Sequence, residues 1–218
     1  MATFPTPDRL AWRPQIARPS ATGRTVVDPI IEPLWEGVHL LAHVRDRVVR
    51  LVDRDGDDLA REFAEITTGV SEAIAATEAV VDGWITNQAT RSGEGLALIT
   101  IDATRGVPLI RPPTVVAAKV PAHDRPQQIA FIAVDLLSLD DQPLLDLPLL
   151  ERKRLLDSVV VGSELVRTSP YVRPPIERWL PSWQAVGFTG AVLKAANSRY
   201  VPGGATDEWS VTQPPRRR

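Results

Sequence analysis

Residues 32–56 read EPLWEGVHLLAHVRDRVVRLVDRDG, and this stretch indicates the fold class. Alternate apolar residues from Leu40 to Val44 share one face, which is typical of a half-buried β-strand. A turn is predicted at residues 45–47, and the apolar run at residues 48–52 then continues the strand pattern. The stretch therefore predicts a β-hairpin.

Strands and helices outside this hairpin come in groups and do not alternate strictly. The other predicted strands are residues 79–85, 96–101, 114–120, 129–137 and 190–195. The predicted helices are residues 58–66, 149–160 and 175–186. This arrangement predicts an α+β domain with mainly antiparallel sheets and packed helices.

Composition narrows the class of protein. The chain has 218 residues, 44% of them hydrophobic, which is enough to bury a sizeable core. The formal net charge is -2, so contact with DNA would depend on local basic patches. The sequence contains no cysteine, which excludes disulfides, thiolate zinc sites and cysteine nucleophiles. It lacks both a signal-peptide pattern and an apolar run of about 18 residues, so we expect a cytoplasmic protein with no membrane partner.

The sequence divides into three parts. Residues 1–28 are rich in Pro, Arg and Thr without periodicity, and we expect an extended N-terminal segment there. Residues 29–213 carry the predicted elements and form the expected domain. Residues 214–218 are a basic tail, for which a solvated end is the plainer reading and contact with a phosphate backbone the alternative.

Several segments, in the same order, resemble the motifs of ATP-dependent DNA ligases. They are Glu32 to His39, Asp53 to Leu59, Val80 to Trp84, Phe131 to Asp140 together with Leu147 to Leu156, Thr189 to Lys194, and Ser198 to Trp209. The resemblance implies an ATP-grasp-like nucleotidyltransferase (adenylation) domain. Because the sequence ends shortly after Trp209, we expect no C-terminal oligonucleotide-binding (OB) domain of the kind that ligases carry.

The resemblance places a leucine where the family has its nucleophile. In these ligases a lysine of the first motif attacks the α-phosphate of ATP and forms a covalent adenylate. The corresponding residue here is Leu34, whose hydrocarbon side chain offers no nucleophilic atom. Lys119 and Lys194 are the lysines that could take over this role from another strand.

The family's magnesium and triphosphate ligands are also replaced. Trp84 and Thr189 stand where the resemblance places metal-binding carboxylates, and magnesium needs such oxygen ligands. Val211 and Gln213 stand where the family has two lysines near its fifth motif. We therefore expect no cofactor, although the family uses ATP and magnesium.

The resemblance defines a degenerate nucleotide-binding cleft with no catalytic residue and no metal ligand. Its residues are Glu32, Leu34, Glu36, His39, Arg54, Trp84, Val134, Thr189 and Lys194. Arg54 and Lys194 match positions that contact ribose or phosphate in the family. These two residues could therefore still bind a nucleotide or phosphate. The alternative is that their side chains are only solvated or ion-paired and were left over from ancestry.

Other patterns have plainer readings. His39 and His43 share one face of a predicted strand, but without a third ligand no metal site is expected. The aspartates of residues 53–58 suggest calcium, yet the glycine comes too early for an EF-hand loop and a turn is favoured.

Most tryptophans are expected in the core, although Trp84 could fill the emptied cleft. The charged residues 151–154 are expected on the solvated face of a helix.

Two classes of function follow. The first is a pseudoenzyme, a binding or regulatory module for a protein partner linked to DNA repair. The second is an active ATP-dependent ligase or nucleotidyltransferase whose nucleophile is relocated or supplied by a partner. A module that binds DNA ends or nicks without sealing them is a further alternative, and salt-dependent binding would distinguish it.

Overall fold

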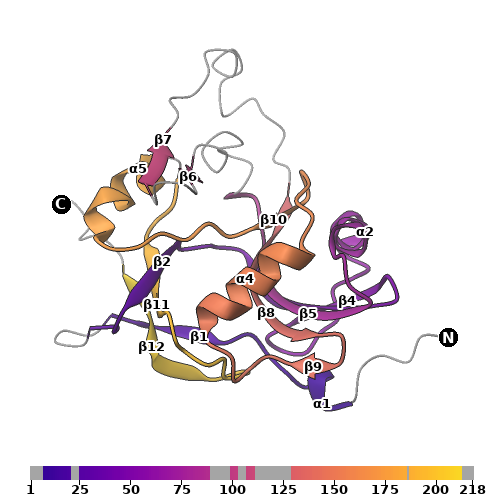
Figure 1. Ribbon diagram of the computed structural model, residues 1–218. Coiled ribbons are helices and arrows are strands. Elements are labelled where there is room, and N and C mark those ends of the chain that lie inside the picture. Colours follow the sequence, from indigo (N-terminus) through magenta and orange to yellow (C-terminus); the bar gives the residue numbers. More distant parts are fainter. Residues whose placement is uncertain are drawn as a thin grey trace, which may run out of the picture.

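The computed structural model describes residues 7–20, 25–88, 99–102, 107–110, 129–185 and 187–212. Two main sheets carry the domain (Figure 1). The four-stranded sheet has the order β1-β12-β11-β2, and the larger sheet has the order β10-β8-β5-β3-β4 with β9 paired to β8. All pairings within these two sheets are antiparallel except β1 with β12 and β10 with β8, so the predicted α+β class is confirmed.

The elements have the following bounds. The four-stranded sheet is built from β1 (Ile16–Pro19), β2 (Pro29–Pro33), β11 (Ala191–Ala195) and β12 (Ala205–Thr212). The larger sheet is built from β3 (Val38–Arg45), β4 (Val48–Asp53), β5 (Glu78–Thr86), β8 (Ala130–Leu139), β9 (Gln142–Pro143) and β10 (Val166–Thr168). A separate pair is formed by β6 (Ile99–Asp102) and β7 (Val107–Ile110). The helices are α1 (Pro7–Leu10), α2 (Ala64–Ala73), α4 (Leu149–Val159), the 3-10 helix η3 (Ile176–Arg178) and α5 (Leu180–Ala185).

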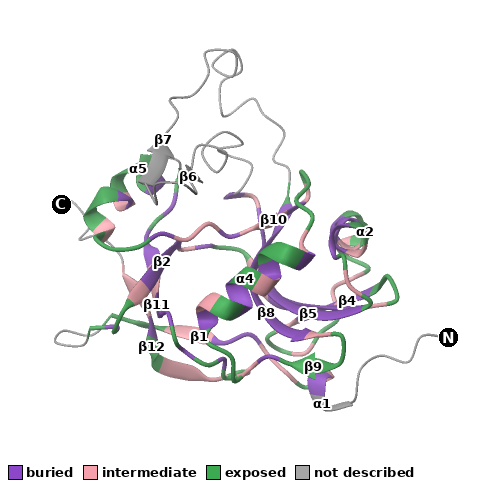
Figure 2. Cartoon of the chain, viewed as in Figure 1, coloured by how far each residue is buried: buried purple, intermediate pink, exposed green. Residues whose placement is uncertain are grey.

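Side-chain alternation along β3 separates two cores. Leu40, Ala42 and Val44 point toward α2 and form one core with its buried face. Leu41 points the other way, toward residues of the four-stranded sheet, and belongs to a second core. A third core gathers Trp35, Trp179 and Trp183 beside α5. The purple, buried strands β8 and β5 run through the centre of the molecule (Figure 2).

Some of the predicted helices and strands are confirmed, and others are wrong or lie outside the described residues. The hairpin, the strands near β5, β8 and β11, and the helices near α4 and α5 are confirmed. The helix predicted at residues 58–66 is wrong at its start, because Asp58 closes the turn after β4 and α2 begins only at Ala64. No strand was predicted at the residues of β12. The strand predicted at residues 114–120 lies outside the described residues.

The N-terminal segment is part of the folded domain. Its extended part contains β1, which adds a parallel edge strand to β12. Arg9 is buried, and its guanidinium donates hydrogen bonds to Glu78 Oε1 and Ser138 Oγ, both at 2.8 Å. These contacts hold the segment against the larger sheet although the sequence there shows no periodicity.

Two glycines are required by close backbone approaches. A Cβ on Gly37, at φ +136°, would lie 2.2 Å from the carbonyl oxygen of Ile85. A Cβ on Gly83 would lie 2.4 Å from ring atoms of Phe131. Both glycines belong to ligase-like motifs, so in this chain these motif positions serve the packing of β3, β5 and β8.

Candidate functional site

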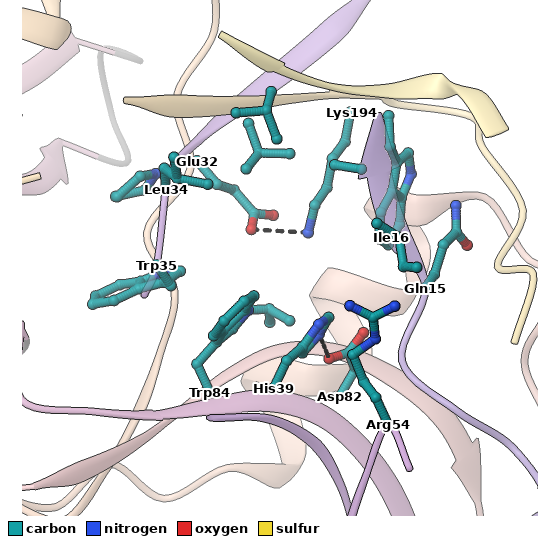
Figure 3. A pocket seen from close by; sticks show the side chains of 16 residues that line it. Gln15, Ile16, Glu32, Leu34, Trp35, His39, Arg54, Asp82, Trp84 and Lys194 are labelled. Carbon is teal, nitrogen blue, oxygen red and sulfur yellow. Dashed lines mark hydrogen bonds and ion pairs between the residues drawn. The ribbon is translucent and has the colours of Figure 1, made fainter. Parts of the chain in front are cut away.

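A cavity of about 150 Å³ lies between the two main sheets (Figure 3). We call it the inter-sheet cavity and define it by its lining. It is lined by Gln15, Ile16, Ala17, Glu32, Pro33, Leu34, Trp35, His39, Arg54, Asp82, Trp84, Val134, Val192, Lys194, Trp209 and Val211. Residues from β1, β2, β11 and β12 form one side, and residues from β3, β5 and β8 form the other.

The structure brings most of the expected cleft residues to this cavity. Those that line it are Glu32, Leu34, His39, Arg54, Trp84, Val134 and Lys194. Glu36 and Thr189 do not line it. Both are exposed, and Thr189 Oγ1 donates a hydrogen bond to Glu36 Oε1 at 2.5 Å. Val211, from the expected triphosphate-binding positions, does line the cavity, whereas Gln213 lies outside the described residues.

Leu34 stands directly after the last residue of β2. Its backbone N–H donates to the carbonyl oxygen of Gly190 at 3.0 Å, which fixes the chain beside the start of β11. Its side chain then contributes hydrocarbon to the cavity wall next to Trp35. The position that the resemblance assigns to a nucleophilic lysine therefore presents an apolar surface.

A buried charge cluster closes one side of the cavity. The Glu32 carboxylate on β2 forms two ion pairs, one with Lys153 on α4 at 2.6 Å and one with Lys194 on β11 at 3.0 Å. The three side chains are at most 6% exposed. One carboxylate thus faces two ammonium groups, and the cluster carries one uncompensated positive charge.

The pKa values within this cluster shift as that charge imbalance requires. Burial opposes ionisation of Glu32, but the two lysines outweigh it and hold the pKa of the carboxyl below its usual value. Burial lowers the pKa of Lys153, and repulsion from Lys194 acts in the same direction. Attraction to Glu32 offsets only part of this, because one carboxylate is shared between two cations.

Aromatic rings surround the charged groups. Lys194 Nζ lies 4.3 Å from the centroid of the Trp209 ring, a cation–π contact. On the opposite side Trp84 stacks on His39, with ring centroids 4.2 Å apart and planes 7° from parallel. Trp84 therefore occupies part of the cleft, as the sequence allowed, while Trp35 and Trp209 are buried.

Asp82 organises the floor of the cavity. Its Oδ1 lies 2.7 Å from His39 Nε2, and its Oδ2 accepts a hydrogen bond from the Tyr200 hydroxyl at 2.6 Å. Burial raises the pKa of Tyr200, and the charge of Asp82 adds to the shift, so the hydroxyl stays a donor. The backbone N–H of Gln15 donates to the same hydroxyl, which ties the N-terminal segment to the floor.

Arg54 follows β4 and reaches toward the cavity beside His39 (Figure 3). Within the described part of the chain its guanidinium makes no hydrogen bond or ion pair. The neighbouring aspartates do not bind it, since Asp53 Oδ1 instead accepts backbone N–H groups of Asp55, Gly56 and Asp57. This pattern is a turn, as the sequence predicted for residues 53–58.

Some lining residues had no signal in the sequence. Gln15, Ile16 and Ala17 form a wall although they lie in the aperiodic N-terminal segment. Lys153 was expected on a solvated helix face, which is wrong: it is 1% exposed and Arg152 is fully buried. Only the outer members of residues 151–154 are exposed.

His43 supplies a pH-dependent contribution to stability. It is fully buried, its two ring nitrogens have no hydrogen-bond partner, and burial lowers its pKa to about 4, with Arg50 and Arg13 adding to the shift and Asp58 opposing it. Because the folded pKa lies below the usual 6.5, this contribution is present above pH 6.5 and is lost as the pH falls toward 4.

We expect the wild-type protein to lose about 3 kcal/mol of unfolding free energy through His43 between pH 7 and pH 4. The His43→Leu variant should lack this part of the decrease. Urea unfolding of both proteins at the two pH values measures the difference. An equal decrease in both would show that His43 is not the group that titrates.

The cavity does not fit the ATP and magnesium that the family resemblance implies. Its volume is about half the lower limit of typical ligand pockets, which is about 300 Å³. No group of three or more His, Cys, Asp or Glu residues that could hold a metal ion occurs among the described residues. The positions expected for metal-binding carboxylates carry an indole that stacks on His39 and a hydroxyl that binds Glu36.

Comparison with known proteins places the chain in a family. The family described as ATP dependent DNA ligase domain matches residues 17–210. The chain therefore belongs to the ATP-dependent DNA ligase domain family, and the resemblance seen in the sequence is confirmed. Among the described residues, no helix is both long and apolar enough to cross a membrane.

Its relatives are longer proteins. DNA ligase C1 of Mycolicibacterium smegmatis is 26% identical over 179 residues, covering 79% of this chain and 48% of the relative. The multifunctional non-homologous end joining DNA repair protein LigD of Mycobacterium tuberculosis is 26% identical over 82% of this chain and 20% of the relative. The chain thus spans about half or less of these relatives.

Solved structures show the same fold. The ligase domain of M. tuberculosis LigD superposes with a TM-score of 0.64 and 21% identity, covering 94% of this chain and 60% of that chain. The adenylated Chlorella virus DNA ligase superposes with a TM-score of 0.56 and 11% identity, covering 93% and 67%. The two main sheets are therefore those of a ligase nucleotidyltransferase domain.

Proposed function

We propose that this chain is a ligase-family adenylation domain that does not form a lysine adenylate and acts by binding. The observation that carries the proposal is the side chain of Leu34, which lines the inter-sheet cavity and which the sequence resemblance assigns to the position of the family's nucleophile. A hydrocarbon cannot attack a phosphate. The proposed role is that of a module for a protein partner, and the relatives named for non-homologous end joining favour a link to DNA repair.

Three further features support the loss of adenylation. The cavity measures about 150 Å³, below the range of typical ligand pockets, Trp84 stacks on His39 at its wall, and Thr189 is engaged with Glu36 outside it. They affect two requirements: space for the nucleotide, and the carboxylates that the resemblance assigns to the metal at the positions of Trp84 and Thr189. Restoring the lysine alone would leave the other defects in place.

An intact-mass measurement tests the proposal. After incubation with ATP and magnesium, we expect no mass increase of one AMP, either in the wild-type protein or in Leu34→Lys. The ligase domain of M. tuberculosis LigD serves as the positive control. An AMP adduct on the wild-type chain would overturn the proposal, and peptide mapping would then identify the modified residue.

A relocated nucleophile is the second candidate function, and the position of Lys194 favours it. Lys194 lines the same cavity as Leu34, whereas Lys119 lies outside the described residues. Against this, the Lys194 ammonium is held by Glu32 and lies over the Trp209 ring, and both contacts stabilise a cation that has no lone pair to donate. An adduct that disappears in Lys194→Met would support this second candidate.

A further inference from the structure

The inter-sheet cavity has the size of one aromatic ring. An engineered protein cavity of about 150 Å³ holds benzene, whereas drug-sized ligands occupy about 300 Å³ or more. At about 150 Å³ the present cavity matches the first case. Leu34, Val134 and Val192 supply aliphatic surface, and Trp35 and Trp84 supply ring surface.

The cavity also carries an excess of positive charge. Glu32 balances only one of Lys153 and Lys194, so one ammonium charge is left over. No other carboxylate of the described residues forms an ion pair with either lysine: Asp135 is paired with Arg152, and Asp157 acts on Lys153 only from beyond ion-pair distance. Of the two lysines, it is Lys194, at 6% exposure, that borders the cavity, together with Glu32.

Arg54 adds a second cation at the lining. Asp82 is the remaining carboxylate there, and both its oxygens are already engaged, with His39 and with Tyr200. Arg54 is therefore left without a partner within the described residues. The excess charge of the buried lysine cluster is unfavourable, and an anion of matching size beside Lys194 would relieve it. Arg54 is exposed, so its guanidinium is available to an anion seated in the cavity.

We propose that the inter-sheet cavity binds a compact aromatic monocarboxylate, with its ring against the tryptophans and its carboxylate between Lys194 and Arg54. This inference rests on the proposed function, since it takes the cavity to be free of nucleotide. It assigns the site a ligand class that differs from ATP in size, in charge and in needing no metal.

Benzoate is the probe, and benzamide is its neutral isostere. We expect calorimetry to show benzoate binding at millimolar concentration and benzamide binding about tenfold or more weakly, because charge-assisted hydrogen bonds are stronger than neutral ones. Lys194→Met and Arg54→Ala should each weaken benzoate about tenfold. Arg61→Ala, an exposed arginine outside the cavity lining, should leave binding unchanged.

Leu34→Phe provides the steric test. The larger ring should fill the cavity and abolish benzoate binding, while an unchanged circular-dichroism spectrum and urea midpoint show that the variant is folded. Equal binding of benzoate and benzamide would overturn the assigned anion. No binding of benzoate to the wild type, or binding that survives in Leu34→Phe, would overturn the site.

The intact-mass measurement separates this inference from the proposed function. Absence of both an AMP adduct and benzoate binding would remove only the ligand assignment. Displacement of benzoate by AMP, together with an adduct, would remove both proposals.

Discussion

Replacing Glu32 by glutamine is expected to lower the free energy of unfolding by about 3–5 kcal/mol, the range for breaking a buried ion pair from one side. Glu32 is 2% exposed and, among the residues that the structure describes, is the only carboxylate within ion-pair distance of Lys153 and Lys194. Glutamine keeps the shape and can still accept a hydrogen bond, but two buried ammonium groups would lose their counter-charge. Urea unfolding at pH 7 measures the change.

Lys194→Met is the matched control for this prediction. It removes a cation from the same cluster but leaves Glu32 and Lys153 as a balanced pair at 2.6 Å. The expected loss is about 1 kcal/mol or less, of the order of the cation–π contact with Trp209. If Glu32→Gln is as mild as Lys194→Met, charge balance does not stabilise this region and the excess-charge argument fails.

Local sequence patterns predicted the elements whose pattern of burial can be seen in their own residues. The hairpin of β3 and β4 has one face on α2, so its apolar alternation was visible and its turn was correctly placed. In β8 the whole strand is buried apart from its last residue, and an apolar run interrupted only by Asp135 within residues 129–137 predicted it equally well. For these elements, the burial of each side chain can be inferred from the neighbouring residues in the sequence.

Elements defined by distant partners could not be predicted in this way. β12 has a polar sequence with one buried tryptophan, and it is a strand because β11 and β1 pair with its two edges. β1 has no periodicity and is fixed by the same pairing. Tertiary hydrogen bonding decides both strands, and it leaves little trace in a window of adjacent residues.

The cavity was located by motif order, because the chain belongs to the ligase family and its strands bring those motifs together. Glu36 and Thr189 were placed in the cleft by the same reasoning, yet they pair with each other at the surface. Lys153 was missed because a charged residue on an amphipathic helix normally faces solvent. Here α4 contacts two cores, with Leu149 in one and Leu156 in the other, so most of its circumference is covered.

Replacing Arg152, next to Lys153 on α4, is the second change for which we expect a large loss of stability. Its side chain and that of Asp135 are fully buried. Nε and Nη2 donate to the two carboxylate oxygens at 2.9 and 2.8 Å, and Nη1 donates to the carbonyl oxygens of Leu147 and Ser198. One guanidinium thus joins β8, the segment before α4 and the segment after β11.

Arg152→Met should therefore lower the unfolding free energy by about 3–5 kcal/mol, because it leaves the Asp135 carboxylate buried without its counter-charge. Arg154→Met, two residues along the same helix, removes only an exposed contact with Glu151 and should change stability by about 0.5 kcal/mol or less. The double variant Asp135→Leu with Arg152→Met should recover part of the loss, since a buried ion pair can be replaced by apolar side chains. Similar losses in Arg152→Met and Arg154→Met would show that helix propensity, and not the buried pair, sets the effect.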